Sequence, residues 1–522
     1  MGKIEATFDR QPLPGSGEGT EAAFDVVIIG AGIGGLLCGN LLAREGYRVC
    51  VLEKNKQIGG ALQTFTRDKV LFDSGVHYIG GLDRGQTLHQ IFRYLNILDQ
   101  VGFQRMDEDA FDKIIIEGDD REYALAQGYE RFEASLCRDF PQETEAIHAY
   151  TAKIREVCGH FALYNLRSGG QEVEGRTGDN IDTESFIRSL TDNPTLQAVL
   201  AGNNILYAGQ RDKTPFYVHA LILNSYIESA WKCPGGGSRI AGALAKNIRA
   251  LGGTVRTGAP VRKIIEAGGR VSHVELEDGS VVRGRDYVSN MHPVTTLEMT
   301  DAKLIKRAYR NRLQALENSA SAFSLHLVLK EGAFPYFHHN YYYHRRGRLW
   351  DMTNYRPEEW PLGYALFASP QTGQLFARSL TLMTFMKYDE VHPWADTYNT
   401  VSAKTFRGEG YEAFKRDRAQ RLLALAGGKF PGLPGAVHSW YASTPLSYRD
   451  YLGTEDGAVY GIVKDHADPV RTLIPPRTKI PNLYLTGQNL HLHGILGAAI
   501  SALVTCSALL GRDDFIERIK GD

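Results

Sequence analysis

A run of glycines near the start of the chain is the sequence feature with the clearest chemical use. Gly30, Gly32 and Gly35 have the spacing G-x-G-x-x-G, which is typical of a turn that holds a dinucleotide pyrophosphate. In such a turn the first glycine permits a tight bend and the second lets the backbone approach the phosphates. The third lets the following helix pack closely on the sheet.

Glu53 supplies the acidic group that such a site needs. It follows Gly35 by about 20 residues, the separation at which an acid accepts hydrogen bonds from the ribose hydroxyls of an adenosine. The same carboxylate would repel a 2′-phosphate, so the predicted nucleotide is ADP-like and is not NADP. From these residues alone, FAD and NAD both fit.

The residues around the glycine run predict a βαβ unit that would position it. Phe24 to Ile29 is a mainly apolar, β-branched run, typical of a strand buried in a parallel sheet. Leu36 to Gly46 predicts a helix, and Arg48 to Glu53 predicts a second strand. The helix N-terminus would present free backbone N–H groups to a phosphate.

Later segments predict further parts of the same nucleotide-binding region. Arg239 to Leu251 is an amphipathic stretch that follows a second glycine run. Val271 to Leu276 and Val281 to Arg283 predict a hairpin around the turn Asp278-Gly279. Asn482 to Gly487 predicts a strand that leads into a helix of small residues.

Composition and charge narrow the class of protein. The chain has 522 residues, 43% of them hydrophobic, and a formal net charge of -1, which predicts two or three domains and no general attraction to nucleic acid. The six cysteines have no CxxC pair, so we expect free thiols in the cytoplasm and no metal site. Residues 1–22 lack the apolar stretch of a signal peptide and predict a flexible tail.

Longer motifs resemble a known group of flavoproteins. These motifs are Gly59-Gly60, Phe72 to Gly81, Val288 to Pro293, Thr444 to Tyr451, Gly457 to Gly461, Thr486 to Asn489 and His493 to Ala499. With the glycine run and Glu53, they resemble FAD-dependent amine-oxidase-like flavoproteins, within the branch of phytoene desaturase, carotenoid cis-trans isomerase and retinol saturase. The resemblance covers most of the chain. Amine oxidases proper usually carry Arg directly after the paired glycines, whereas this chain has Ala61, which argues against an amine substrate.

The resemblance implies an α/β fold of amine-oxidase-like architecture. A discontinuous Rossmann-like FAD-binding domain with a parallel sheet would carry an inserted substrate domain of mixed α+β structure. The expected boundaries are 23–103, 232–300 and 472–522 for the FAD-binding domain, and 104–231 and 301–471 for the substrate domain.

The resemblance also implies which residues would bind FAD and which would donate a proton. The cofactor-binding set is Gly30, Ala31, Gly32, Gly35, Glu53, Lys54, Gly60, Ala61, Val261, Gly487, Gln488, Gly497 and Ala498. Because the flavin would carry the chemistry, the protein would supply an apolar cleft and one proton donor. Tyr460, His77 and Tyr78 are the candidates for that donor.

The implied activity is redox-linked chemistry on a water-insoluble polyene. Either a C=C bond of a retinoid-like or carotenoid-like substrate is saturated, or reduced FAD isomerises it. The run from Thr444 to Gly461 favours these reactions over a phytoene-type desaturation that passes electrons to a quinone or oxygen. A flavin-containing lipid-binding protein without turnover is the alternative from another class. We expect a hydrophobic substrate and peripheral contact with a membrane, whereas the electron partner stays unassigned.

Three stretches allow more than one interpretation. Gly494 to Leu510 carries no charge, and we favour a core helix, with its positive end toward the flavin, over a membrane span. His491 and His493 could hold a metal, but without a nearby Cys or acidic ligand we expect them to line the flavin cleft. His338 to Arg348 predicts a strand that runs into a solvated loop, with substrate or membrane contact as the alternative.

Overall fold

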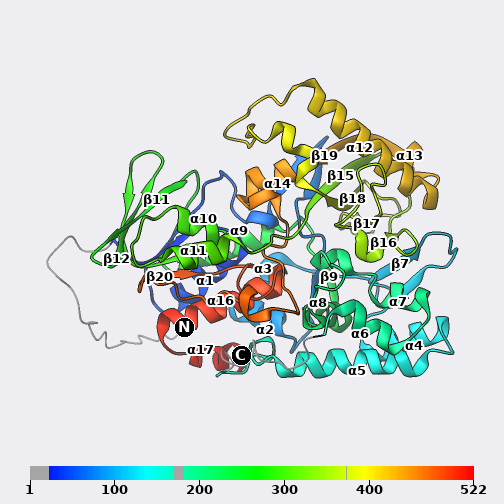
Figure 1. Cartoon of the computed structure of the whole chain (residues 1–522), viewed down its shortest axis with the longest axis horizontal. Coiled ribbons are helices and arrows are strands. Elements are labelled where there is room, and N and C mark those ends of the chain that lie inside the picture. The colour runs from blue at the N-terminus through cyan, green and yellow to red at the C-terminus, as the bar shows by residue number, and fades with distance from the viewer. Residues whose placement is uncertain (1–22, 170–180, 372, 522) are drawn as a thin grey trace.

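Two sheets organise the part of the chain that the structure describes. The computed structural model describes residues 23–169, 181–371 and 373–521, so the predicted tail of residues 1–22 lies outside it. One is a parallel sheet that contains the first strand, and the other is a larger mixed sheet. Figure 1 shows the two regions side by side, with helices around both. The α/β class expected from the sequence is confirmed.

The strand that precedes the glycine run lies at the centre of the parallel sheet. β1 (Phe24–Ile29) pairs with β2 (Val49–Leu52) on one side and with β14 (Gly284–Ser289) on the other. The outer strands are β10 (Thr254–Arg256) and β20 (Leu483–Leu485), and the order is β10-β2-β1-β14-β20. All four pairings are parallel, so all five strands end at the same edge of the sheet, where the glycine turn lies.

The two faces of this sheet are buried in different hydrophobic cores. Val26 and Ile28 belong to the large core that includes α1 (Ile33–Arg44), whereas Val27 and Ile29 belong to a second core. Successive side chains of a strand point to opposite faces. A strand that is apolar on both faces is therefore covered on both sides, as its sequence predicts.

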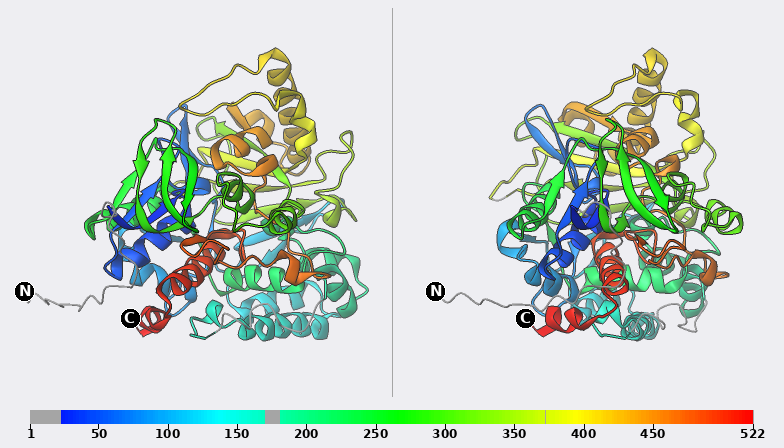
Figure 2. Two further views of the ribbon diagram at one scale, coloured as in Figure 1. Left: turned by 60° about the vertical axis from the view of Figure 1, so that its left-hand side comes forward. Right: turned by 90° about the vertical axis from the view of Figure 1, so that its left-hand side faces the viewer.

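Helices from three parts of the chain cover one face of this sheet. The N–H of Leu36 donates to the carbonyl of Gly32 at 3.0 Å, so α1 begins at Ile33, earlier than the predicted start at Leu36. α9 (Ser238–Ala250) and α16 (Gly494–Leu510) both pack against α1 (Figure 2).

α16 is a core helix. Almost all its residues from Ile495 to Ala508 are buried, and many of them are Ala, Ser or Gly, which lets the helix approach α1 closely. The expected core helix is thus confirmed, whereas the approach of its positive end to the flavin stays a prediction. Within the described ranges, no helix is both long enough and apolar enough to cross a bilayer.

The predicted hairpin covers the other face of the parallel sheet. β12 (Arg270–Leu276) and β13 (Val281–Val282) pair in antiparallel fashion, and β11 (Val261–Ala267) adds a third strand. Gly279 in the turn has a φ of 81°, which glycine adopts without strain. Side chains of this small sheet form the second core together with β1 and β2.

The larger sheet is mixed and deeply buried. Its order is β19-β15-β18-β17-β16-β7-β8. The strands are β7 (Asp112–Ile116), β8 (Tyr123–Leu125), β15 (Ser321–Leu329), β16 (Asn340–His344), β17 (Gly363–Ala368), β18 (Ser379–Met386) and β19 (Val437–Ser443). β16 and β7 are parallel, and the other neighbours are antiparallel. Every residue of β15, β17 and β18 is buried.

Helices lie on opposite sides of the mixed sheet. In Figure 1, α5 (Thr144–His160) lies below it and α12 (Gly408–Lys429) lies above it. Other helices are α2 (Thr87–Tyr94), α3 (Leu98–Val101), α4 (Tyr129–Asp139), α6 (Thr183–Leu190), α7 (Pro194–Leu200), α8 (Phe216–Glu228), α10 (Pro293–Glu298), α11 (Arg307–Gln314), α13 (Leu433–Ala436), α14 (Pro445–Leu452), α15 (Pro469–Thr472) and α17 (Asp514–Gly521). Short strands are β3 (Thr64–Arg67), β4 (Val70–Asp73), β5 (Ile79–Gly80), β6 (Gln104–Arg105) and β9 (Ala230–Lys232).

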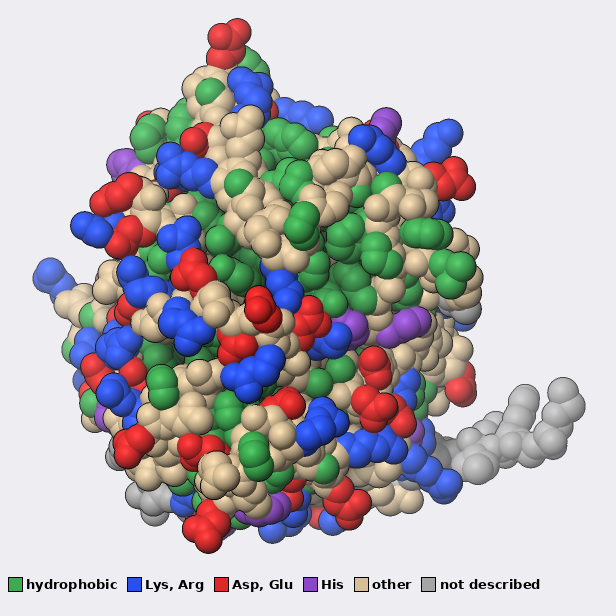
Figure 3. Space-filling view, turned by 90° about the vertical axis from the view of Figure 1, so that its right-hand side faces the viewer, with side chains coloured by type: hydrophobic (Ala, Val, Ile, Leu, Met, Phe, Trp, Pro, Cys, Tyr) green, Lys and Arg blue, Asp and Glu red, His purple; other side chains and the backbone are tan. Residues whose placement is uncertain are grey.

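The basic and aromatic stretch from His338 to Arg348 is β16 followed by a loop, as favoured from the sequence. The charge of Arg348 is neutralised by ion pairs with Asp351 and Glu359. On the face in Figure 3, Lys and Arg side chains are intermixed with Asp and Glu, and hydrophobic side chains gather in the upper half of the view. This face therefore presents no broad patch of a single sign.

Candidate functional site

The glycine turn after β1 packs backbone against backbone. A Cβ at Gly35 would lie 2.1 Å from the carbonyl oxygen of Gly30, and Gly30 itself has a φ of 95°. A Cβ at Gly34 would lie 2.9 Å from the Cα of Gly487. The turn after β1 and the segment after β20 thus touch at a point where side chains do not fit. The positive φ of Gly30 fits its predicted role in a tight turn, and the short distance at Gly35 fits its predicted role in close packing.

Asn290 closes this turn from the end of β14, and the predicted cofactor-binding set does not include it. Cβ atoms at Gly32, Gly34 and Gly487 would lie 2.8, 2.6 and 2.6 Å from its amide atoms. Its only sequence signal was membership of the motif Val288 to Pro293, because a single amide has no spacing rule of its own.

Glu53 ties the glycine turn to the end of β2. Its side chain is almost completely buried, and its carboxylate accepts hydrogen bonds from the N–H groups of Ala31 at 3.0 Å and Asn55 at 2.9 Å. Burial raises the pKa of Glu53 although both hydrogen bonds oppose the shift. A carboxylate has about four lone-pair positions. Glu53 therefore keeps acceptor capacity for the hydroxyls of a ribose.

The paired glycines lie against the same turn. The N–H of Gly59 donates to the carbonyl of Ala31 at 2.8 Å, and a Cβ at Gly60 would lie 3.3 Å from the Cα of Gly32. Gly60 and its neighbour Ala61 then line a cavity. The structure therefore brings these predicted cofactor residues next to the turn that would hold the nucleotide.

Other members of the predicted cofactor set have contacts of their own. The ammonium of Lys54 donates to the carbonyl of Asp450 at 3.0 Å, at the end of α14. Val261 is buried in the second core, opposite Leu276. Gln488 lies 3.5 Å from the carbonyl of Val459 through its side-chain nitrogen. Cofactor contacts of these three residues remain predictions.

Two cavities meet beside these residues. Gly75, Met383 and Tyr460 line both of them. The inner cavity has a volume of about 120 Å³ and extends along the first turn of α16, including Gly497. The outer cavity has a volume of about 800 Å³ and borders the pair Gly60-Ala61. Predicted cofactor residues thus border both cavities, whereas Ala498 is buried inside α16.

The inner cavity has an uncharged lining among the described residues. The lining is Gly75 to Gly80, Leu88, Tyr164, Ile205, Leu206, Leu221, Ile222, Ser225, Tyr226, Phe367, Met383, Tyr460 and Leu492 to Gly497. Burial lowers the pKa of His77 to about 3 and that of His493 to about 4, so both rings are neutral at neutral pH. Burial likewise raises the pKa of the lining tyrosines, which keeps them protonated.

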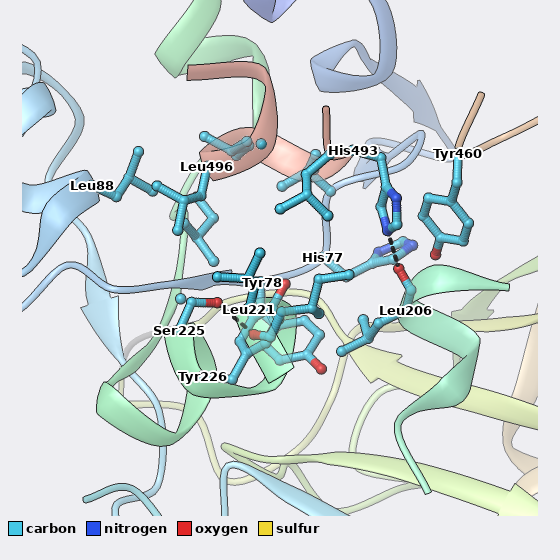
Figure 4. Close-up of a pocket in the computed structure, with 18 of the residues that line it drawn as sticks. His77, Tyr78, Leu88, Leu206, Leu221, Ser225, Tyr226, Tyr460, His493 and Leu496 are labelled. Atoms are coloured by element: carbon cyan, nitrogen blue, oxygen red, sulfur yellow. Dashed lines mark hydrogen bonds between the residues drawn. The ribbon is translucent and has the colours of Figure 1, made fainter. Parts of the chain in front are cut away.

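The three predicted proton donors lie together in this cavity. His77, Tyr78 and Tyr460 all line it, and Figure 4 shows His77 and Tyr460 at the same end as His493. The rings of Tyr460 and His493 lie 4.5 Å apart between centroids, and His77 stacks on Phe367 at 4.2 Å. All three residues are therefore close enough to the cavity to donate a proton to a molecule bound there. Their roles as donors stay predictions.

Sequence reasoning missed the group that holds Tyr78. Its hydroxyl donates to the carboxylate of Asp112 at 2.8 Å and lies 2.7 Å from the hydroxyl of Tyr342. Asp112 is fully buried on β7. No motif or spacing in the sequence joins these three residues, since their proximity depends on the pairing of β7 with β16.

The polar groups here are not arranged as a metal site. Over the described ranges, no three His, Cys, Asp or Glu side chains gather closely enough to hold a metal ion. The Nε2 of His493 donates to the carbonyl of Leu206 at 3.0 Å, and His493 lines the inner cavity, so its place in a flavin cleft stays a prediction. His491 is not part of that lining.

Comparisons with known proteins point to one family. Residues 33–376 match the family described as flavin containing amine oxidoreductase. All-trans-retinol 13,14-reductase from Macaca fascicularis is 30% identical, with 94% of this chain and 86% of the relative covered. Prolycopene isomerase 1, chloroplastic, from an Oncidium hybrid cultivar is 25% identical over 96% and 87% of the two chains. The solved structure of cyclohexylamine oxidase from Brevibacterium oxydans is 15% identical, covers 95% and 100% of the two chains and has a TM-score of 0.58, which indicates the same fold.

Replacement of Glu53 by Arg is expected to remove the bound FAD. The change deletes the acceptor for Ala31 N–H and buries an unpaired cation beside the nucleotide turn. The ratio of flavin absorbance to protein absorbance after purification measures the effect. Glu331→Arg, which makes the same change at an exposed position, should keep the wild-type ratio. A fully yellow Glu53→Arg variant would show that the turn is not the nucleotide site.

Gly497 is expected to tolerate no side chain. A Cβ there would lie 2.4 Å from the carbonyl oxygen of Leu492, so Gly497→Ala should cost about 1–3 kcal/mol of stability and lower the flavin content. Gly242→Ala on α9 is the matched control, because no atom lies within 4 Å of the position that a Cβ would take there. Denaturant unfolding and flavin absorbance measure both variants. Equal stability of Gly497→Ala and wild type would contradict the packing at the start of α16.

Proposed function

Because the chain belongs to the family of flavin-containing amine oxidoreductases, we propose that it uses FAD to saturate or isomerise a C=C bond of a hydrophobic polyene, such as a retinoid or carotenoid. The uncharged inner cavity beside α16 carries this proposal. A charged ammonium buried there would lack a counter-ion. An apolar polyene instead gains free energy from burial against a neutral lining.

FAD is the cofactor, and the residues present fit it. Gly32, Gly34 and Gly35 of the turn leave no room for a side chain, and Glu53 keeps acceptor capacity for a ribose. Bound FAD supplies transfer of a hydride to or from a carbon atom. The first turn of α16 borders the inner cavity, where its positive end stabilises negative charge.

The two cavities suit different parts of the task. The inner cavity, with its aliphatic and aromatic lining, keeps water away from the reacting bond. The outer cavity is large enough for an extended apolar chain, and its lining combines aromatic side chains with charged ones; these are Phe65, Trp440 and Tyr448, and Arg67, Lys404, Arg407, Glu412 and Lys415. His77, Tyr78 and Tyr460 are the proposed proton donors. Saturation needs such a donor, whereas isomerisation makes no net change in protons or electrons.

The proposed division into domains follows the two sheets. The strands of the parallel sheet come from 23–103, 232–300 and 472–522, which we assign to FAD binding. The strands of the mixed sheet come from 104–231 and 301–471, which we assign to the substrate. This assignment accounts for a site at the junction of both regions.

The test of the proposed function is anaerobic turnover with candidate polyenes. The purified protein is reduced with dithionite in the presence of detergent-dispersed retinol or lycopene. The products are separated by chromatography, and their masses are measured by mass spectrometry. A product with two added hydrogens supports saturation, and a product of unchanged mass and altered retention supports isomerisation. Tight binding of each polyene without any product would contradict both and favour a lipid-binding protein.

We also propose that the polyene enters from a membrane surface. Val401 and Phe406 line the outer cavity and are 66% and 82% exposed, with the exposed cation Lys404 between them in the chain. Apolar side chains beside a cation suit the interface of an anionic bilayer. The six unpaired cysteines support a reducing compartment such as the cytoplasm.

Phe406→Asp is expected to weaken binding to vesicles of phosphatidylcholine and phosphatidylserine, because a carboxylate would replace the most exposed apolar side chain at the cavity entrance. Cosedimentation measures binding. Leu375→Asp is the matched control, since Leu375 is 81% exposed and lies outside both cavities. Leu375→Asp should also keep the wild-type turnover of detergent-dispersed substrate, whereas vesicle binding is the readout for Phe406→Asp, because Phe406 lines the outer cavity. Equal vesicle binding by both variants and wild type would refute the entrance as a membrane contact.

A further inference from the structure

A fully buried carboxyl group lies directly behind the inner cavity. Asp112 accepts hydrogen bonds from the hydroxyl of Tyr78 at 2.8 Å and from the side-chain amides of Asn203 at 2.6 Å and Asn340 at 2.9 Å. All four side chains are buried, and Asp112 itself is not part of the cavity lining. A buried charge has a high desolvation cost. The presence of the Asp112 carboxyl group in this buried position therefore suggests a role beyond packing.

Tyr78 connects this carboxyl group to the cavity. Of the three proposed donors, it alone has a hydroxyl that is bonded to a carboxyl group among the described residues. Tyr460 makes no hydrogen bond through its hydroxyl, and His77 makes none through its ring, within the same part of the chain. Only Tyr78 therefore has a partner from which a donated proton can be replaced.

Buried acceptor atoms continue away from Asp112. Asn203 and Asn340 donate their amide groups to Asp112, and the Oδ1 of each has no partner among the residues that the structure describes. His344 donates from Nε2 to the carbonyl of Gly202, so its unpartnered Nδ1 is also an acceptor. Buried acceptors of this kind are normally satisfied by internal water. Internal water bound to Asn203 and Asn340 would lie beside Asp112 and would be the source of its replacement proton.

The charges around Asp112 favour exchange of its proton near neutral pH. Burial raises its pKa to about 7, against the opposing effects of its three hydrogen bonds and of Lys232. Lys232 is buried as well, donates to the carbonyl of Ala368 at 2.9 Å, and has its pKa lowered to about 7. Burial, and after it the charge of Asp112, raises the pKa of Tyr78, Tyr342 and Tyr226, which keeps each of them neutral.

We propose that Asp112 and Tyr78 form a proton relay that supplies the proton for saturation, an inference that rests on the proposed function. The π bond of the substrate breaks, one carbon receives the hydride that reduced FAD supplies, and the other receives the proton of the Tyr78 hydroxyl. The Tyr78 oxygen takes the proton of Asp112, and Asp112 takes one from water. The net change is addition of one hydride and one proton. Tyr78 is then the catalytic residue, and Asp112 acts through it.

The relay explains how a tyrosine with a raised pKa can serve as a donor. Loss of a proton from Tyr78 without a proton from Asp112 would leave a buried phenolate, and beside an ionised Asp112 it would put two like charges together. Transfer of the Asp112 proton in the same step avoids the phenolate. The charge then rests on Asp112, where Asn203 and Asn340 already donate hydrogen bonds.

The test uses Asp112→Asn and Tyr78→Phe in the holoenzyme. Both variants should keep their flavin and their affinity for the polyene but lose about 100-fold or more in the saturation rate, the contribution typical of a general acid. The wild-type rate should fall as the pH rises through about 7, because the relay needs protonated Asp112. The Asp112→Asn variant should have a low saturation rate that does not fall as the pH rises through about 7. Lys232→Met should move the fall to higher pH, since removal of a cation raises the pKa of Asp112.

Glu228→Gln is the matched control. Glu228 is another acid at the end of α8 whose pKa burial raises to about 7, and it does not line the inner cavity. This variant should keep the wild-type rate and pH profile. Infrared spectroscopy supplies a readout without turnover: the C=O band of protonated Asp112 should titrate in the wild type and be missing only in Asp112→Asn.

The outcomes separate the relay from the function on which it rests. A wild type that converts no polyene overturns the proposed function. An Asp112→Asn variant with wild-type rate and pH profile overturns the relay alone. So does an Asp112 that stays ionised at every pH at which the protein is folded. Saturation in D₂O that adds no deuterium to the product would also overturn the relay, because its proton comes from solvent.

Discussion

The close contact between the glycine turn and the segment after β20 is the constraint on which the site depends. Gly34 meets Gly487 with no room for a Cβ, and Asn290 fills the remaining space from the end of β14. Three distant parts of the chain must therefore come together before the turn has its final shape. α16 begins shortly after this contact, at Gly494, and its first turn borders the inner cavity.

Local patterns in the sequence predicted the elements of the parallel sheet well. β1, the hairpin of β12 and β13, and α16 are where periodicity and glycine placed them, because each forms from neighbouring residues. The order of the mixed sheet could not be predicted in this way. β15 pairs with β18 and β19, which follow it at long separations. Its own sequence, which is buried throughout although it includes Ser324 and His326, gives no information on partners.

The same distinction applies to the site. His77, Tyr78 and Tyr460 were predicted from motifs, and they line one cavity. Asp112 was not predicted, because an acid between Phe111 and Lys113 at a strand start has no motif of its own, and only the folded sheet brings Asn340 of β16 beside it. Hydrogen bonds between polar side chains on different strands can be identified only once the strand pairing is known. Motifs therefore identified residues of the cavity lining but not Asp112, which lies behind that lining.

The arrangement of charge around the inner cavity favours chemistry on an apolar substrate. Neutral side chains form the wall, whereas ionisable Asp112 and Lys232 lie one layer behind it, reached through Tyr78 or backbone. A charge in the wall itself would hold water and oppose entry of a polyene. An ionisable group behind the wall can still supply a proton to the cavity, because a neutral hydroxyl in the wall connects the two through a hydrogen bond. This separation lets one cavity exclude water and remain supplied with protons.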